Sequence, residues 1–279
     1  ADLAEQLMDG GEDVLGGTES IGTVLFSDIR SFTTFTEHLG AQGTVKFLNE
    51  YFTVMVDCIQ SEGGMLDKFI GDAIMAIFGT PVVHDDDPDR GVRSAIKMMR
   101  ELQNYNEHRK NQGKPPVDHG MGLNTDMIVS GNIGSPKRMD YTVIGDGVNL
   151  AARVESACKK YGAHILMSEF TFNALKATYR TRQVDKVIVK GKTVPVGVYE
   201  VLDYHNKESF PNIIEVLEMF NNGIEYYNEG RWNDAIKQFN KAQIGNPEDK
   251  CSNMYVKRCE QLKKEDPKDW DGVWVAKSK

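Results

Sequence analysis

The chain has 279 residues, of which 40% are hydrophobic and 27% are charged, and its formal net charge is -8. This composition is typical of a globular protein with one large domain and an appendage, or with two domains, and the acidic balance argues against a nucleic acid partner. No run of about 18 apolar residues predicts a membrane span, and four cysteines without zinc-site spacing predict reduced thiols in the cytoplasm.

The elements predicted in chain order alternate between helix and strand. Residues 1–20 are predicted to form a lead-in, with a short amphipathic helix and a glycine-rich link. A buried strand over 21–27, a helix over 41–62, two strands over 65–79 around a turn at Gly71 and a helix over 87–110 follow. Further strands are predicted near 117–124, 127–133, 164–168 and 184–202, with a helix near 147–160. This order lacks the regular βαβ rhythm and predicts an α+β sandwich with a largely antiparallel sheet.

The segment VLFSDIRSFT (24–33) places Asp28 at the end of a buried strand, before a turn and a helix start. Backbone N–H groups at a helix N-terminus bind anions, and an aspartate beside them suits a divalent metal that also touches phosphate. A helix-capping role for Asp28 stays open.

The segment MLDKFIGDAIMAIFG (65–79) places Lys68 and Asp72 in an apolar stretch, where charges need partners. Asp72 could be a turn aspartate, and Lys68 could be a lysine whose head reaches water. Two strand-end aspartates, Asp28 and Asp72, could instead share a pair of metal ions, as nucleotidyl transfer requires.

Two further motifs carry candidate ligand-binding residues. In DYTVIGDGVNLAARVES (140–156), Asn149 and Arg153 lie four apart on one helix face beside small residues, which leaves room for a ligand; a solvated face is the alternative. In VIVKGKTVPVGVYEV (187–201), Lys190 ends a strand and could be an ordinary hairpin lysine. The acidic run HDDDPDR (84–90) is predicted to be a solvated helix start and not a metal site.

Four motifs in this order, FSDIRSFT, LDKFIGDAIMAIFG, TVIGDGVNLAARVES and VKGK, resemble the catalytic domain of class III nucleotidyl cyclases over residues 21–204. The resemblance implies a ferredoxin-like α/β sandwich that acts as a head-to-tail homodimer. Residues 1–20 then resemble the lead-in that couples such domains to an upstream sensor.

The resemblance also implies the site residues on the metal and phosphate side. Asp28 and Asp72, with the backbone carbonyl of Ile29, would hold two Mg²⁺ or Mn²⁺ ions, with Ca²⁺ admissible at one site. The residues that would hold the triphosphate are Phe32, Thr33 and Lys190. Asp126 stands where many members have glycine, and Gly120 where some have a phosphate-binding arginine, so phosphate contacts are expected to be fewer.

On the nucleoside side, the resemblance makes Lys68 and Thr142 the purine-selecting pair, a combination found in a bacterial-type subgroup of adenylyl cyclases. Asn149 would orient the ribose and Arg153 would stabilise the pentavalent phosphorus. A lysine can donate to N1 of adenine but not to the N1–H of guanine, so Lys68 favours ATP. The predicted function is an adenylyl cyclase that makes cyclic AMP and pyrophosphate; a guanylyl or relaxed-specificity cyclase and an inactive cyclase-fold scaffold are the alternatives.

From about residue 205, strand signals stop and helical periodicity takes over, so 205–279 is predicted to be a small all-α appendage. The stretch 219–247 resembles one tetratricopeptide repeat, whose small residues let two helices cross closely. Asn222 departs from the leucine expected there. A single repeat cannot bury its own core, so it is expected to pack on the catalytic domain, a second protomer or a protein partner.

Overall fold

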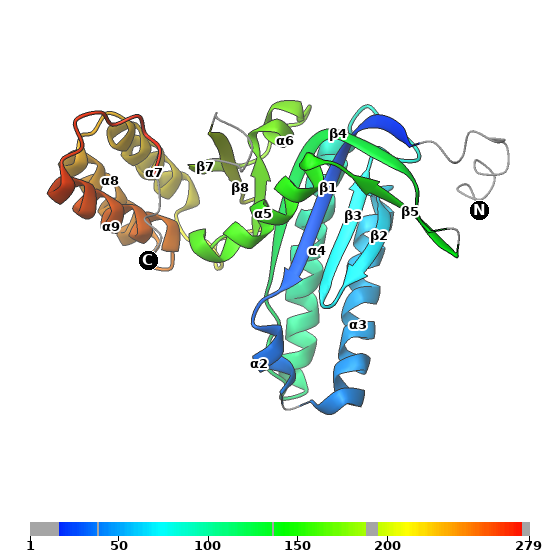
Figure 1. The fold of residues 1–279 in the computed structure, drawn as a ribbon. Coiled ribbons are helices and arrows are strands. Elements are labelled where there is room, and N and C mark those ends of the chain that lie inside the picture. Colours follow the sequence, from blue (N-terminus) through cyan, green and yellow to red (C-terminus); the bar gives the residue numbers. More distant parts are fainter. Residues whose placement is uncertain (1–16, 38, 136, 188–194, 275–279) are drawn as a thin grey trace.

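The computed structural model describes residues 17–37, 39–135, 137–187 and 195–274 (Figure 1). Its centre is one eight-stranded sheet in the order β2-β3-β1-β4-β6-β8-β7, with β5 paired to β4. Neighbouring strands are antiparallel except for β4 and β6. The strands are β1 (Thr18–Ile29), β2 (Met65–Ile70), β3 (Ala73–Phe78), β4 (His119–Ser135), β5 (Arg138–Ile144), β6 (Ile165–Ser168), β7 (Thr181–Val187) and β8 (Val196–Val201).

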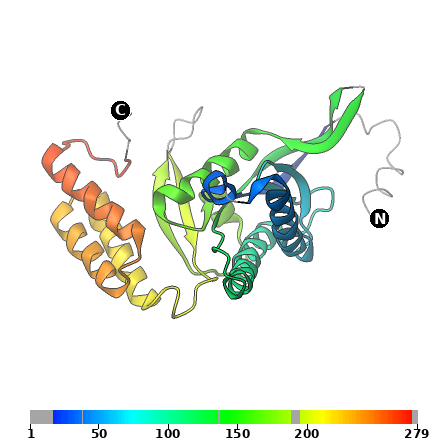
Figure 2. The same cartoon turned by 90° about the horizontal axis from the view of Figure 1, so that it is seen from below.

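Helices cover both faces of the sheet. α3 (Gly40–Ser61) and α4 (Asp87–Asn111) lie side by side on one face (Figure 2), and α5 (Asp146–Tyr161) packs on the other. The alternation of side chains along β1 supplies both cores, because Leu25 packs under α3 and α4 while Val24 packs on the α5 side. The series β1-α3-β2-β3-α4-β4 with the spatial order β2-β3-β1-β4 is that of a ferredoxin-like sandwich.

Three helices at the C-terminal end pack beside β7 and β8 (Figure 1): α7 (Ile213–Asn228), α8 (Trp232–Gly245) and α9 (Lys250–Glu265). Their buried aromatic residues form one hydrophobic cluster with α5 and with strands β6, β7 and β8. α7 and α8 cross closely at Gly223, where an added Cβ would lie 2.6 Å from the ring of Phe239. The buried apolar face of these helices is therefore covered by the sheet domain of the same chain.

Buried ion pairs also join the C-terminal helices to the sheet. Arg182 on β7 contacts Glu200 on β8 at 2.7 Å and both carboxylate oxygens of Asp249, which precedes α9, at 2.7 and 2.9 Å. Arg258 on α9 contacts Asp185 on β7 at 2.8 Å. Since all five side chains are buried, each charge depends on its partner for compensation.

Replacing Asp249 by alanine is therefore expected to destabilise the whole chain. The variant leaves Arg182 with only Glu200 in a site that is 4% exposed, which should cost about 3 kcal/mol of unfolding free energy. Urea unfolding followed by circular dichroism measures this. The matched control is Asp234→Ala, which removes exposed ion pairs to Arg231 and Lys237 and should change little. Equal losses in the two variants would show that the buried pairs do not hold the appendage.

The structure corrects several predicted elements. The strands expected at 117–124 and 127–133 are one strand, β4, because residues 125 and 126 continue the pairing with β1. The strand expected over 184–202 is the pair β7 and β8. β1 starts at Thr18, inside the predicted lead-in, of which residues 1–16 lie outside the described residues. β5 and α6 (Glu169–Ala174) were not predicted, and the helix start expected after Asp28 is the short helix α2 (Phe32–Thr36). The division of the chain into domains at residue 205 stays a prediction.

The acidic run at the start of α4 is not a solvated helix start as predicted. Asp87 and Asp89 are buried at 5% and 1% exposure. Asp89 accepts hydrogen bonds from the backbone N–H groups of Lys176 and Ala177, so it fixes the segment after α6 to the N-terminus of α4. The four cysteines, which are all among the described residues, are buried free thiols. No helix in the described part of the chain is long and apolar enough to cross a bilayer.

Candidate active site

The β1 terminus and the β2–β3 turn bring Asp28 and Asp72 together. β1 pairs with β3 so that Ser27 lies opposite Ile74, which places the next residue of β1 beside the start of β3. The turn between β2 and β3 passes through Gly71 at φ +65°, a conformation that favours glycine, and presents Asp72 directly before β3. Two strand-end carboxylates thus converge at one edge of the sheet.

The electrostatic environment of this pair disfavours two negative charges without a cation. Burial, and then the neighbouring Asp72 carboxylate, raises the pKa of Asp28 to about 6. Burial and the negative charge of Asp28 likewise raise the pKa of Glu155, on α5, to about 7. Within the described residues neither aspartate forms an ion pair, and no cluster of three or more metal-ligating side chains was found. Carboxylate oxygens are the donors that Mg²⁺ and Mn²⁺ prefer, so the pair fits a divalent cation bound with help from backbone or substrate oxygens.

The segment after β1 places the predicted phosphate-binding residues. Ile29 is the last residue of β1 and is buried, and Phe32 and Thr33 begin α2 after Ser31 in a left-handed conformation. The N–H groups of the first turn of a helix have no partner inside the helix, so they are available to an anion. Lys190, the other predicted phosphate ligand, lies outside the described residues.

Lys68 and Thr142 are brought together from separate strands. The Lys68 ammonium on β2 donates to the Thr142 hydroxyl on β5 at 2.9 Å, and Thr142 donates to Asp67 at 3.0 Å. The ion-pair partner of Lys68 is Asp67, at 3.2 Å, and not Asp72 on the other side of the turn. The sequence reasoning missed Asp67, and the available signal was a third charge in an otherwise apolar run.

Asn149 and Arg153 project from α5 and are exposed. Among the described residues neither makes a hydrogen bond or an ion pair, so both side chains are available to a ligand. Within the described part of one chain there are thus three groups: Asp28 with Asp72, Lys68 with Thr142, and the two α5 side chains. No hydrogen bond in this part joins one of these groups to another. Glu155 on the same helix was also missed; its signal was an acidic residue two positions after Arg153.

The two departures from the cyclase pattern are accommodated by α5. A Cβ at Gly120 would lie 3.0 Å from the Glu155 carboxylate and 3.1 Å from Cβ of Cys158, so a larger residue there would require α5 side chains to shift by a few tenths of an ångström. Asp126 accepts the N–H of Met127, and its Cβ faces Gly147 at the start of α5. Neither residue contributes a cation for phosphate.

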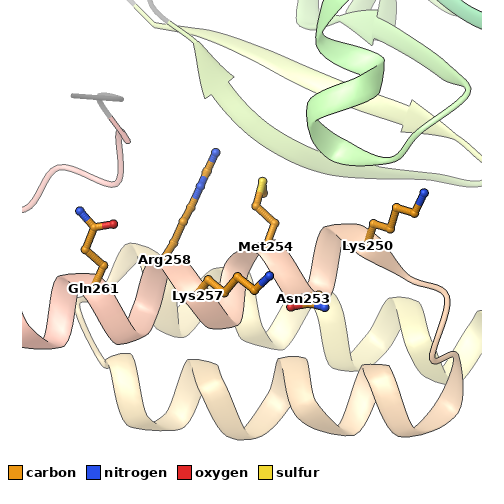
Figure 3. A pocket seen from close by; sticks show the side chains of 6 residues that line it. All are labelled: Lys250, Asn253, Met254, Lys257, Arg258 and Gln261. Atoms are coloured by element: carbon orange, nitrogen blue, oxygen red, sulfur yellow. The ribbon is translucent and has the colours of Figure 1, made fainter. Parts of the chain in front are cut away.

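A groove of about 370 Å³ runs along α9 (Figure 3). It does not include Asp28 or Asp72. It is lined by Lys250, Asn253, Met254, Lys257, Arg258 and Gln261. Figure 3 shows Arg258, Met254 and Lys250 on the side of α9 that faces the sheet domain, and Arg258 is held there by Asp185. None of the predicted site residues lines this groove.

Comparison with known proteins gives a consistent picture. Residues 17–203 match the family model described as the adenylate and guanylate cyclase catalytic domain. The chain is 36% identical over 244 residues to the terminal-differentiation specific adenylate cyclase of Dictyostelium discoideum. The matched region covers 86% of this chain but only 11% of that protein. The chain therefore spans about a tenth of that relative.

Two solved structures share the fold at similar identity. One is the crystal structure of the adenylyl cyclase CyaB from P. aeruginosa, with TM-score 0.62, 36% identity and coverage of 68% of this chain and 97% of that chain. The other is the guanylyl cyclase Cya2, with TM-score 0.60, 38% identity and coverage of 67% and 94%. Because both nucleotide specificities occur at equal distance, identity alone does not assign the substrate. The family match and both structures agree on one assignment: this chain belongs to the adenylate and guanylate cyclase catalytic domain family.

Proposed function

We propose that this chain is an adenylyl cyclase, which converts ATP to 3′,5′-cyclic AMP and pyrophosphate. The observation that carries the choice of ATP is the contact between Lys68 and Thr142 at 2.9 Å. A lysine N–H can donate to N1 of adenine, whereas N1 of guanine carries a hydrogen and repels the donor. A threonine oxygen can accept from the adenine amino group. The pair is thus complementary to adenine and mismatched to guanine.

The residues near the β1 terminus fit a role in binding the metal–triphosphate part of the substrate. Asp28 and Asp72, with the carbonyl of Ile29, would hold two Mg²⁺ or Mn²⁺ ions, with Ca²⁺ admissible at one of the two sites. Such ions lower the pKa of a ribose 3′-hydroxyl and neutralise phosphate charge. The N–H groups of Phe32 and Thr33, together with Lys190, would hold the triphosphate.

The α5 residues would act on the reacting groups. Asn149 would orient the ribose so that its 3′-oxygen faces the α-phosphorus in line with the departing pyrophosphate. Arg153 would contact the phosphoryl oxygens, whose charge grows as the new bond forms. An interaction that strengthens in the transition state raises turnover. The exposure of both side chains in one chain leaves them free for this role.

A head-to-tail homodimer would complete each site. Exposed apolar side chains support such an interface: Phe69 and Ile70 on β2 are 44% and 51% exposed, and Met139 and Ile144 on β5 are 47% and 52% exposed. β5 and the end of β4 extend away from the body of the molecule as an arm (Figure 1). In the proposed dimer, each site takes the metal aspartates from one chain and the purine, ribose and phosphorus ligands from the other.

The C-terminal helices are proposed to form a tetratricopeptide-like repeat. The close crossing of α7 and α8 at Gly223 supports this, since small residues let helices approach. We propose that the repeat caps the catalytic domain and offers its remaining surface to a protein partner. An upstream sensor, coupled through residues 1–20, is a further proposal. A catalytically inactive scaffold is less well supported, because none of the proposed catalytic positions carries an inactivating residue type.

The test is a comparison of the two nucleotides on the purified chain with Mn²⁺. Cyclic AMP formation from ATP should have a higher kcat/KM than cyclic GMP formation from GTP. A preference for GTP would favour the guanylyl alternative. No cyclic nucleotide from either substrate at micromolar protein would favour the scaffold.

Metal binding is expected to weaken below pH 6. In the metal-free protein, burial and Asp72 raise the pKa of Asp28 to about 6, so protons compete with the cation below that pH. Lower pH has the opposite effect on the stability of the metal-free protein. Because the pKa of Asp28 is raised on folding, the folded state binds more protons than the unfolded state, so the free energy of unfolding increases as the pH falls through about 6. Electron paramagnetic resonance of free Mn²⁺ should show the Kd rising toward about tenfold per pH unit below pH 6. A constant Kd between pH 5 and 8 would contradict the assignment of Asp28 as a ligand.

A further inference from the structure

Asp67 occupies an irregular position in β2. The pairing of β2 with β3 shifts between Leu66, opposite Ala76, and Lys68, opposite Met75, so Asp67 is the extra residue of a β-bulge. In a regular strand, successive side chains point to opposite faces. A bulge changes that alternation and re-aims a side chain. The bulge lets both Asp67 and Lys68 reach Thr142 on β5.

The hydrogen bonds at Thr142 have a defined direction. The hydroxyl has one hydrogen, which is donated to Asp67 Oδ2 at 3.0 Å. Its oxygen accepts from Lys68 at 2.9 Å, and one lone pair remains. With its hydrogen committed to Asp67, the hydroxyl can only accept from a ligand. An acceptor at this position suits the amino group at C6 of adenine and opposes the carbonyl oxygen at C6 of guanine.

In the described part of the chain, the carboxylate of Asp67 has no partner besides Thr142 and Lys68. Its side chain is fully buried, with 0% exposure, and Oδ1 has no hydrogen-bond partner among the described residues. Its contacts are Thr142 and the ion pair with Lys68. A buried carboxylate oxygen without a partner costs stability, so the packing of the fold does not account for this residue.

We propose that Asp67 is a positioning residue that fixes the direction of the Thr142 hydroxyl and thereby sets the preference for adenine over guanine. This rests on the proposed function, since Thr142 must face the purine. When the acceptor is removed, the hydroxyl rotates and can donate to the guanine carbonyl. The discrimination that Thr142 provides is then lost, while the metal and phosphate ligands remain.

The experiment compares Asp67→Leu with Asp67→Asn, two side chains of similar size that both remove the negative charge. Asparagine keeps an oxygen that can accept from Thr142, and leucine does not. For Asp67→Leu, the ratio of kcat/KM for ATP to that for GTP should fall about tenfold, the value of one lost hydrogen bond. For Asp67→Asn, the ratio should stay within about threefold of the wild-type ratio. Asp67→Ala serves as the second variant without an acceptor if the leucine variant does not fold.

A double variant that includes Thr142→Val tests whether the effect of Asp67 on nucleotide selectivity depends on Thr142, which a merely structural role would not predict. If Asp67 acts through Thr142, the double variant Asp67→Leu/Thr142→Val should be no less selective than Thr142→Val alone. The inference would be overturned by an unchanged ATP-to-GTP ratio in Asp67→Leu and Asp67→Ala, or by a fall in Asp67→Asn as large as that in Asp67→Leu. In either case, a wild-type preference for ATP would leave the proposed function standing. A wild-type chain that prefers GTP would overturn both.

Discussion

Replacement of Asp72 by asparagine is expected to lower ATP cyclisation at least about a thousandfold, because it removes a proposed metal ligand and a bound cation would supply several kcal/mol of transition-state stabilisation. Asp72 lies in the β2–β3 turn, and its charge raises the pKa of Asp28. Removing that charge relieves repulsion in the metal-free protein, so the variant should be at least as stable as the wild type. The measurement is kcat with Mn²⁺, together with the melting temperature without metal.

The control for this variant is Asp234→Asn, an equal chemical change on the exposed face of α8, which should leave kcat unchanged. If Asp72→Asn keeps activity within about tenfold of the wild type, Asp72 is a turn residue, a common role for aspartate, and the two-metal proposal fails. Retained stability with lost activity would separate the metal role from a folding defect.

A mixture of Lys68→Ala and Asp72→Ala chains is expected to regain activity that neither variant has alone. In the proposed head-to-tail dimer, Lys68 and Asp72 of one chain serve different sites. A heterodimer of the two variants then has both lesions in one site and an intact second site. Purified heterodimers should have about half of the wild-type kcat per dimer, and a 1:1 statistical mixture about a quarter.

Heterodimers are isolated by co-expression with two different affinity tags, and the rate of cyclic AMP formation is compared with that of each homodimer. The matched control mixes Asp28→Ala with Asp72→Ala, whose lesions fall in the same half of the site, so its heterodimers should stay inactive. No recovery in the Lys68→Ala and Asp72→Ala heterodimer would mean that both residues act in one site of one chain.

The charges of the β2–β3 hairpin show how far the sequence could be interpreted. The apolar run indicated that the charge of Lys68 needed a partner, but Asp67, its neighbour in the chain, was overlooked. In the structure, the ion-pair partner of Lys68 is Asp67, which lies in a β-bulge. No hydrophobic periodicity predicts such a bulge. A bulge depends on pairing with the neighbouring strand, and single-strand patterns do not contain that information.

Other misses have the same origin. Two strands were expected on either side of residues 125 and 126, yet β4 is continuous because β1 supplies pairing partners across residues 119–130. The aspartates at the start of α4 had the composition of a solvated helix start, but Asp89 is buried because backbone N–H groups from residues 176 and 177 bind it. Both outcomes depend on partners about 100 and about 90 residues away, respectively, which local composition cannot reveal.

The sequence by itself predicted the family, through four ordered motifs, and also most of the helix–strand order and the candidate site residues, because motifs and spacing within a strand or helix are local properties. Asp28 at a strand end and Asn149 four residues before Arg153 could be found in this way. Only the tertiary structure decided which charges meet. Antiparallel pairing of β1 with β3 places Asp28 beside Asp72, and the approach of β5 to β2 gives Lys68 its contact with Thr142. Such contacts join residues far apart in the chain, and their energies depend on burial that exists only after folding.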